Sequence, residues 1–181
     1  MNEFSEMERI ADALAQSGDR ADIYYAVETA MQHLVGHRLF TLLAILPGGS
    51  EMERFWSSNK AAYPLAGRKR IGTTPWSSAV LEGKKPWLGR TSRDIQWAFP
   101  DYGLIASLGL GSAINIPVVL HGQILGTMNL LHRENYFTND HVKIGACVAP
   151  YLIPAFVEEI RAIEAQSSVQ DPAKNTARNP P

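Results

Sequence analysis

The stretch SAINIPVVLHGQILGTMNLLH, residues 112–132, carries the strongest local signal in the chain. It contains two runs of strand-forming residues, 112–120 and 123–132, which are joined only by His121 and Gly122. A two-residue connection that includes glycine is typical of a tight turn between antiparallel strands. The stretch therefore predicts a β-hairpin.

A long helix is expected after this hairpin. Thr138 is a good capping residue, and apolar positions then recur in steps of three and four as far as Ile163. Pro150 and Pro154 each remove a backbone hydrogen bond, so we expect them to bend the helix. Residues 166–181 are almost free of apolar side chains and are predicted to form a disordered polar tail.

Similar patterns occur before the central hairpin. Residues 39–46 form a nearly continuous apolar run that ends in turn formers, and residues 52–57 follow as a second strand. Two amphipathic helices are expected earlier, one capped by Ser5 and one by Asp22. These elements place a single domain over residues 1–165.

The middle of the chain differs from the rest in charge. The 181 residues carry a net charge of −1, but residues 58–93 contain eight cations and one acid, which gives +7, whereas the remainder carries −8. All four tryptophans lie in or beside this basic segment. Residues 59–70 show no periodicity and are expected to form a long loop, whereas Thr74 and Pro75 predict the start of a short helix. The basic segment is therefore the first candidate for contact with a ligand.

Composition excludes several other classes of protein. Cys147 is the only cysteine, so the chain can form neither an internal disulfide nor a multi-thiolate zinc site. No apolar run approaches the length of a membrane span, and the first residues do not form a signal peptide, so we expect a cytoplasmic protein without a membrane partner. A pI near 6.5 and the lack of a recognisable motif argue against nucleic acid as a partner.

The order of elements and the motifs of the second hairpin resemble those of GAF domains. The resemblance rests on a Pro-Val strand at 116–118, a glycine turn, a Gly-x-Met-Asn-Leu strand at 126–130 and a helix start that begins Phe137-Thr138. It spans roughly residues 5–165. It implies an α+β fold, a three-layer α/β/α sandwich with a central antiparallel sheet of five or six strands, in a single-domain protein without an effector domain.

Three specialised GAF subclasses do not match. The Asn-Lys-Phe-Asp-Glu motif of cyclic-nucleotide-binding members is missing, and the pocket cysteines of bilin-binding and sulfoxide-reducing members have no counterpart. Cys147 lies on the last predicted helix. We therefore expect a module with a small-molecule ligand of unknown identity and with no cofactor.

The resemblance places the ligand pocket between the sheet and the middle loops. In the functional interpretation aromatic side chains enclose the ligand and a cation meets its negative charge; the candidates are Trp56, Tyr63, Trp76, Trp97 and Tyr102, with Arg68 or Lys69 as the cation. Arg68 is the leading cation because a guanidinium can hold a carboxylate or phosphate with two bonds. In the alternative interpretation these aromatic residues belong to the core and the cations form a solvated face.

Two further groups of polar residues have two interpretations each. Asn115 and Asn129 lie in adjacent strands, where a buried amide either pins a neighbouring segment or binds a ligand, and the first role is the commoner one. His33 and His37 have the i, i+4 spacing of a metal pair but stand at a helix end, where capping is ordinary. We expect no metal site and no catalytic residues.

The sequence thus supports three functions in descending order. The first is a non-catalytic sensory or regulatory GAF domain that binds an anionic, partly apolar metabolite. The second is a protein-interaction module, homodimeric through its first and last helices, with an unused pocket. The third is an enzyme on the GAF fold, for which no nucleophile with a matching base is visible.

Overall fold

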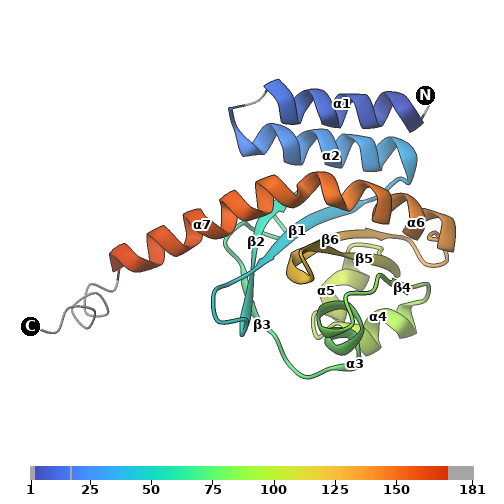
Figure 1. The fold of residues 1–181 in the computed structure, drawn as a ribbon. Helices are drawn as coiled ribbons and strands as arrows, with labels where there is room; N and C mark the ends of the chain where they lie inside the picture. The colour runs from blue at the N-terminus through green and yellow to red at the C-terminus, as the bar shows by residue number, and fades with distance from the viewer. Residues whose placement is uncertain (1–2, 17, 171–181) are drawn as a thin grey trace, which may run out of the picture.

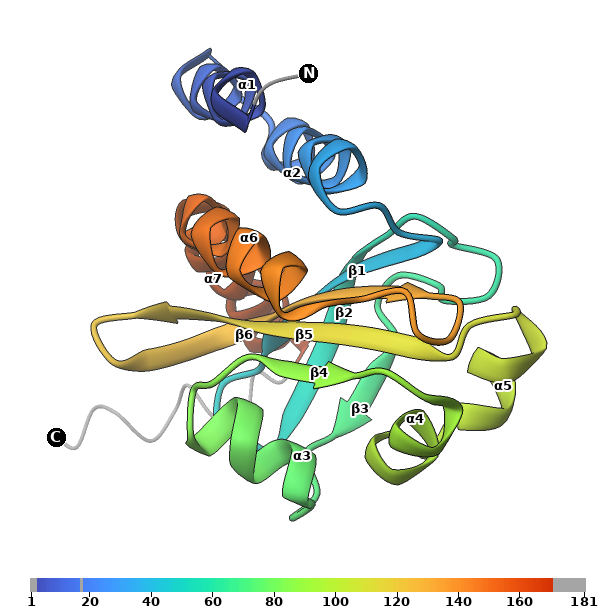
Figure 2. The same ribbon diagram turned by 90° about the vertical axis from the view of Figure 1, so that its right-hand side faces the viewer.

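A six-stranded sheet forms the centre of the computed structural model, which describes residues 3–16 and 18–170. Neighbouring strands are antiparallel throughout and follow the order β3-β2-β1-β6-β5-β4 (Figure 1). The strands are β1 (Leu39–Ile45), β2 (Glu51–Ser57), β3 (Arg68–Arg70), β4 (Trp87–Gly89), β5 (Ser112–Leu120) and β6 (Gln123–His132). Helices cover both faces (Figure 2), which confirms the predicted α+β sandwich.

The hairpin of β5 and β6 has the turn that its sequence predicts. His121 and Gly122 both have positive φ, 48° and 74°, as a type I′ turn requires. The strands pair from Ser112 opposite His132 to Leu120 opposite Gln123. Both strands lie in the interior of the sheet, because β6 also pairs with β1 and β5 with β4.

One face of the sheet is covered by α2 (Arg20–Leu34) and by the C-terminal helices α6 (Asn139–Val148) and α7 (Ile153–Gln170). A 3₁₀ turn, η2 (Ala149–Leu152), separates α6 from α7 and contains Pro150, so the predicted long helix is interrupted there. The first helix, α1 (Glu3–Gln16), packs on α2, outside the layer that touches the sheet (Figure 2).

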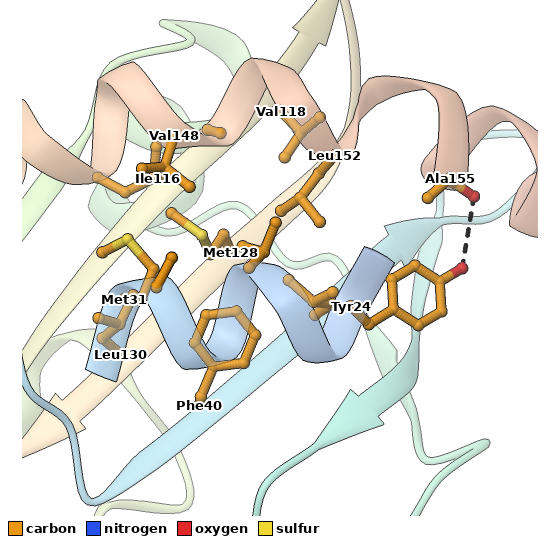
Figure 3. Packing of buried hydrophobic residues seen from close by; sticks show 14 of the residues in the cluster. Tyr24, Met31, Phe40, Ile116, Val118, Met128, Leu130, Val148, Leu152 and Ala155 are labelled. Atoms are coloured by element: carbon orange, nitrogen blue, oxygen red, sulfur yellow. Dashed lines mark hydrogen bonds between the residues drawn. The ribbon is translucent and has the colours of Figure 1, made fainter. Parts of the chain in front are cut away.

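The main core fills the space between these helices and the sheet. Phe40 from β1, Met128 from β6 and Met31 from α2 meet there with side chains that are fully buried (Figure 3). Burying one side chain of this size stabilises the fold by roughly 2–3 kcal/mol. The Tyr24 hydroxyl donates a hydrogen bond of 3.4 Å to the carbonyl of Ala155, so α2 is also tied to α7 by a polar contact.

Three helix boundaries differ from the prediction. The N-cap of α2 is Asp19 instead of Asp22, because the Asp19 carboxylate accepts the amide of Ala21 at 2.9 Å. Helix α1 already begins at Glu3, before the predicted cap at Ser5. Helix α7 continues to Gln170, past the predicted end of the domain at residue 165, and the rest of the predicted tail lies outside the described residues.

The opposite face carries the short middle elements. They are α3 (Pro75–Ser77), the π-helical turn η1 (Ser78–Glu82), α4 (Ser92–Ala98) and α5 (Tyr102–Ser107). Thr74 caps α3 as predicted, and its hydroxyl accepts the amide of Ser77 at 3.0 Å. Helix α5 and strand β3 were not predicted. Strand β3 lies at the end of the predicted 59–70 loop and has no apolar pattern, since it consists of Arg-Lys-Arg.

Gly126 allows the closest approach in the core. A methyl group there would collide with the carbonyl oxygen of Leu43 and lie 2.6 Å from the ring of Phe156. We expect Gly126→Ala to lower the free energy of unfolding in urea by about 3 kcal/mol, because the well-packed neighbours cannot yield. Gly103 on α5 is the matched control, since a methyl group there meets nothing within 4 Å; Gly103→Ala should leave stability unchanged or raise it by up to about 1 kcal/mol. Equal effects of the two variants would contradict the packing described.

Candidate functional site

A cavity of about 310 Å³ lies between the sheet and the layer of short helices. Strands β1, β2, β3, β5 and β6 provide its floor, and the loop before β3, helix α3 and the segment from α4 to α5 provide its walls. The lining residues are Leu39, Thr41, Leu43, Met52, Arg54, Tyr63, Arg68, Lys69, Trp76, Phe99, Pro100, Asp101, Ile105, Asn115, Thr127, Asn129 and Leu131. Its size and its mixture of apolar wall and few polar groups are typical of small-molecule sites.

A chain of hydrogen bonds crosses the floor. The indole N–H of Trp76 donates to Asn115 Oδ1 at 3.0 Å, and Asn115 Nδ2 donates to Asn129 Oδ1 at 2.6 Å. Asn129 Nδ2 then donates to the carbonyl oxygen of Thr41 at 3.3 Å. The two amides therefore pin α3 to three strands. They also line the cavity, so the structural role does not remove them from the candidate site.

Arg54 brings an incompletely bonded cation to the cavity. Its Nη1 donates to the carbonyl of Pro64 at 3.1 Å, and its guanidinium lies 4.8 Å from the centre of the Tyr63 ring. Its Nε is buried and has no hydrogen-bond partner among the described residues. Burial lowers the pKa of Arg54, whereas the negative charge of Asp101 opposes that shift. A buried donor without a protein partner is free to bond an acceptor that enters the cavity.

Lys69 is the second cation inside the site. Its ammonium lies 5.4 Å from the ring centre of Phe99 and 5.9 Å from that of Trp76. No carboxylate lies within 4.0 Å of it in the described part of the chain. Desolvation by burial lowers the pKa of Lys69, and the more distant charge of Asp101 raises it in part. Lys69 is thus a charge taken out of water without a bonded counter-ion.

Asp101 and Tyr63 join the two walls. The Tyr63 hydroxyl donates to Asp101 Oδ2 at 3.1 Å, which links the loop before β3 to the turn before α5. Burial, followed by the charge of Asp101, raises the pKa of Tyr63 well above its usual value. Tyr63 therefore stays a neutral hydrogen-bond donor at physiological pH.

Six of the nine predicted site residues line this cavity: Tyr63, Arg68, Lys69, Trp76, Asn115 and Asn129. Arg68 stands at the rim, where its side chain is 52% exposed and its Nε donates to Glu53 Oε2 at 2.7 Å. The leading cation of the sequence analysis is therefore already paired, whereas Lys69 and Arg54 are not.

The other three predicted residues, Trp56, Trp97 and Tyr102, lie elsewhere. The indole of Trp56 turns toward the helices on the opposite face and donates to Glu28 Oε2 at 2.6 Å. Trp97 is 55% exposed and stacks on Trp87, and Tyr102 is exposed on α5. None of the three belongs to the cavity lining.

Arg54, Asp101 and Thr41 are site residues that the sequence analysis missed. The sequence did contain a signal for the strand residues, because residues two apart in a strand lie on the same face. Thr41 is two residues from both Leu39 and Leu43, and Arg54 is two residues from Met52. For Asp101 no local pattern exists, since its position depends on how the turn before α5 folds over the sheet.

The described residues contain neither a cluster of metal ligands nor a membrane-spanning helix. No group of three His, Cys, Asp or Glu side chains among them could hold a metal ion. No helix in residues 3–16 or 18–170 combines the length and hydrophobicity that a membrane span requires.

The domain thus combines an antiparallel sheet, helices on both of its faces, and a cavity between the sheet and the layer of short helices. A family model described as "GAF domain" matches residues 7–151. The chain therefore belongs to the GAF domain family. GAF domains are sensory and regulatory small-molecule-binding modules of signalling proteins. A search of curated proteins found no match.

Solved structures show the same fold at low sequence identity. The GAF domain of a phosphoenolpyruvate-protein phosphotransferase from Coxiella burnetii is similar with a TM-score of 0.69 and 16% identity, over 91% of this chain and 98% of that one. The GAF domain of a two-component sensor histidine kinase from Bacillus halodurans has a TM-score of 0.65 and 16% identity, over 83% and 99%. A far-red cyanobacteriochrome photoreceptor has a TM-score of 0.61 and 11% identity, over 87% and 96%.

The buried charge of Lys69 should reduce the stability of the ligand-free protein. We expect Lys69→Met to raise the free energy of unfolding by about 1 kcal/mol at neutral pH, because it removes a desolvated ammonium and keeps the apolar stem. The pKa of Lys69 is lowered in the folded state. The charged ammonium therefore lowers the free energy of unfolding by its full amount well below that pKa, and this effect disappears as the pH rises toward 10.5. The stabilisation should therefore shrink in alkaline buffer.

Lys85→Met is the control for this measurement, because Lys85 is exposed and lies outside the cavity lining. Its effect should stay within about 0.5 kcal/mol. A Lys69→Met variant that is less stable than the wild type would show that the ammonium already has a stabilising partner.

Proposed function

We propose that this GAF domain is a non-catalytic sensor whose cavity recognises a small, partly apolar molecule with a negative charge. The observation that carries the proposal is the pair of cations at the cavity, Arg54 with a buried and unpartnered Nε and Lys69 with a desolvated ammonium. Two such groups on one cavity favour an anion, because charge-assisted hydrogen bonds in a partly dry site are strong.

The wall explains why the ligand should also be apolar. Trp76 and Phe99 lie face-on to Lys69, and their ring centres are 6.0 Å apart. Leu43, Met52 and Ile105 extend the apolar lining. An aromatic or branched carboxylic acid would bury its body against these side chains and place its charge at the two cations.

Binding without turnover agrees with the chemistry of the lining. The seventeen lining residues include no serine, cysteine or histidine, and the two groups that could act as nucleophile and base, Lys69 and Asp101, lie beyond 4.0 Å of each other. The one carboxylate, Asp101, accepts a hydrogen bond from Tyr63. A signal that depends on occupancy is therefore a better fit to this site than a reaction.

The ligand class can be tested by titrating the protein with benzoate, indole-3-acetate, branched-chain acids, dicarboxylates and nucleotides. Trp76 in the wall provides a fluorescence signal, and calorimetry gives the affinity. We expect an aromatic or branched monocarboxylate to bind, and Lys69→Met to weaken it by about 2 kcal/mol, or roughly 30-fold in Kd. Arg68→Ala should have a smaller effect, because Glu53 already pairs with Arg68.

Arg93→Gln is the charge-matched control, since Arg93 is exposed on α4 and outside the lining. It removes one positive charge and should leave the affinity within about twofold, because exposed charges are screened. If no acid binds, or if the corresponding amides bind as well as the acids, the anion site is refuted.

Self-association through the first and last helices is a second proposal. It is supported by Phe4 on α1, which is 82% exposed, the largest value among the large apolar side chains of the described residues. Burying this side chain against a second copy would remove its apolar area from water. Light scattering should give twice the chain mass of 20.0 kDa, and Phe4→Ser should shift it toward the monomer. A monomer at all accessible concentrations would contradict the proposal.

A further inference from the structure

Asp101 occupies the N-cap position of α5 but does not cap that helix. Its side chain makes no capping hydrogen bond, and its backbone, with φ −90° and ψ 20°, is not extended. Four other polar N-caps, Asp19, Thr74, Thr91 and Thr138, are extended and accept an amide from the first turn. Ser77, the N-cap of η1, does not, because η1 continues directly from α3. Aspartate is among the best N-cap residues, and with an extended backbone Asp101 could accept a first-turn amide of α5. Its present backbone conformation instead accompanies a bond of the carboxylate to another partner.

That competing partner lies in the cavity. The Asp101 carboxylate accepts the hydroxyl of Tyr63 at 3.1 Å, and its charge acts on both Arg54 and Lys69. Without a ligand, Asp101 therefore supplies the negative charge that partly balances the two cations. It is an incomplete substitute, because it lies beyond ion-pair distance of either cation and leaves Arg54 Nε unbonded.

A ligand anion would change this balance. Arg54 and Lys69 carry two positive charges and Asp101 carries one negative charge, so these three residues have a net charge of +1. A ligand with one negative charge would neutralise them. An anion bonded directly to the cations would repel the nearby Asp101 carboxylate and would compete for the Tyr63 hydroxyl. The first-turn amides of α5 are the nearest alternative partners for Asp101, because they belong to its own helix.

We propose that a monoanionic ligand takes the place of Asp101 beside Arg54 and Lys69, and that the released Asp101 then caps α5. The inference rests on the proposed ligand site and adds how occupancy is transmitted. Binding would break the bond between Tyr63 and Asp101 that joins the two walls and would stabilise the first turn of α5. Because α5 and the loop before β3 are both at the protein surface, the exchange of partners gives a signal that can be read from outside.

The first arm of the test needs no ligand. Tyr63→Phe removes the hydroxyl and keeps the ring on which Arg54 rests, so Asp101 loses its partner and becomes available as a cap. Measured by NMR amide exchange, Gly103 and Leu104 should exchange roughly fivefold more slowly than in the wild type, the effect of gaining an N-cap. Amides in the 59–67 loop should exchange faster.

Asp101→Ala is the matched control, because it breaks the same hydrogen bond but cannot cap. It should loosen the 59–67 loop in the same way without slowing Gly103 or Leu104. If Tyr63→Phe fails to slow these two amides, or slows them as much as Asp101→Ala does, the capping switch is overturned.

The second arm uses benzoate as the probe, added to the wild type and to Asp101→Ala. If benzoate binds, it should slow the exchange of Gly103 and Leu104 in the wild type only. Binding without this slowing overturns the switch and leaves the ligand site intact. If benzoate does not bind, that failure counts against the proposed ligand class, and the result of Tyr63→Phe still decides the switch.

Discussion

The hydrogen-bonded chain from Trp76 through Asn115 and Asn129 to Thr41 sets the shape of the cavity. It ties the helical wall to strands β1, β5 and β6 at bonds of 2.6–3.3 Å. Because the amides and the indole satisfy one another, they can be buried without ligand or water. The wall is thereby held at a fixed distance above the sheet, and the space beside this chain remains open.

The two faces of the sheet consequently serve different purposes. On the face toward α2 and α7, side chains such as Phe40 and Met128 are fully buried and Gly126 lets the backbone and Phe156 approach closely. On the other face a partly desolvated lysine and an arginine with an unbonded Nε occupy the corresponding layer. The first face stabilises the fold, whereas on the second we expect the partly desolvated Lys69 to reduce stability.

The sequence predicted those parts of the fold that depend on local pattern. The His121-Gly122 turn, the Thr74-Pro75 helix start and the apolar strand at 39–46 were each identified because a few neighbouring residues specify them. Strand β3 was missed because three basic residues form it only by pairing with β2, where Glu53 lies opposite Arg68 and Glu51 opposite Arg70. The extent of α7 was missed because polar residues after 165 continue a helix that earlier residues had already nucleated.

The candidate site was harder to predict, because it joins residues that are distant in sequence. The basic segment pointed to Lys69 and Arg68, but not to Arg54, which lies before that segment and reaches the cavity from strand β2. Aromatic content alone could not separate Trp76, which faces the sheet, from Trp56, which turns to Glu28 on the opposite face. Strand alternation would have separated some of these residues; the placement of Asp101 required the structure.

We propose that Arg54 and Lys69 bind an anion in the cavity, and the Arg54 Nε–H would report that binding directly. A ¹H–¹⁵N NMR titration that observes the arginine Nε resonances should show Arg54 Nε–H shifting downfield and exchanging more slowly as benzoate is added. The neutral analogue benzamide should leave the resonance unchanged. Binding of benzoate with no change at Arg54, or an equal response to benzamide, would contradict the account.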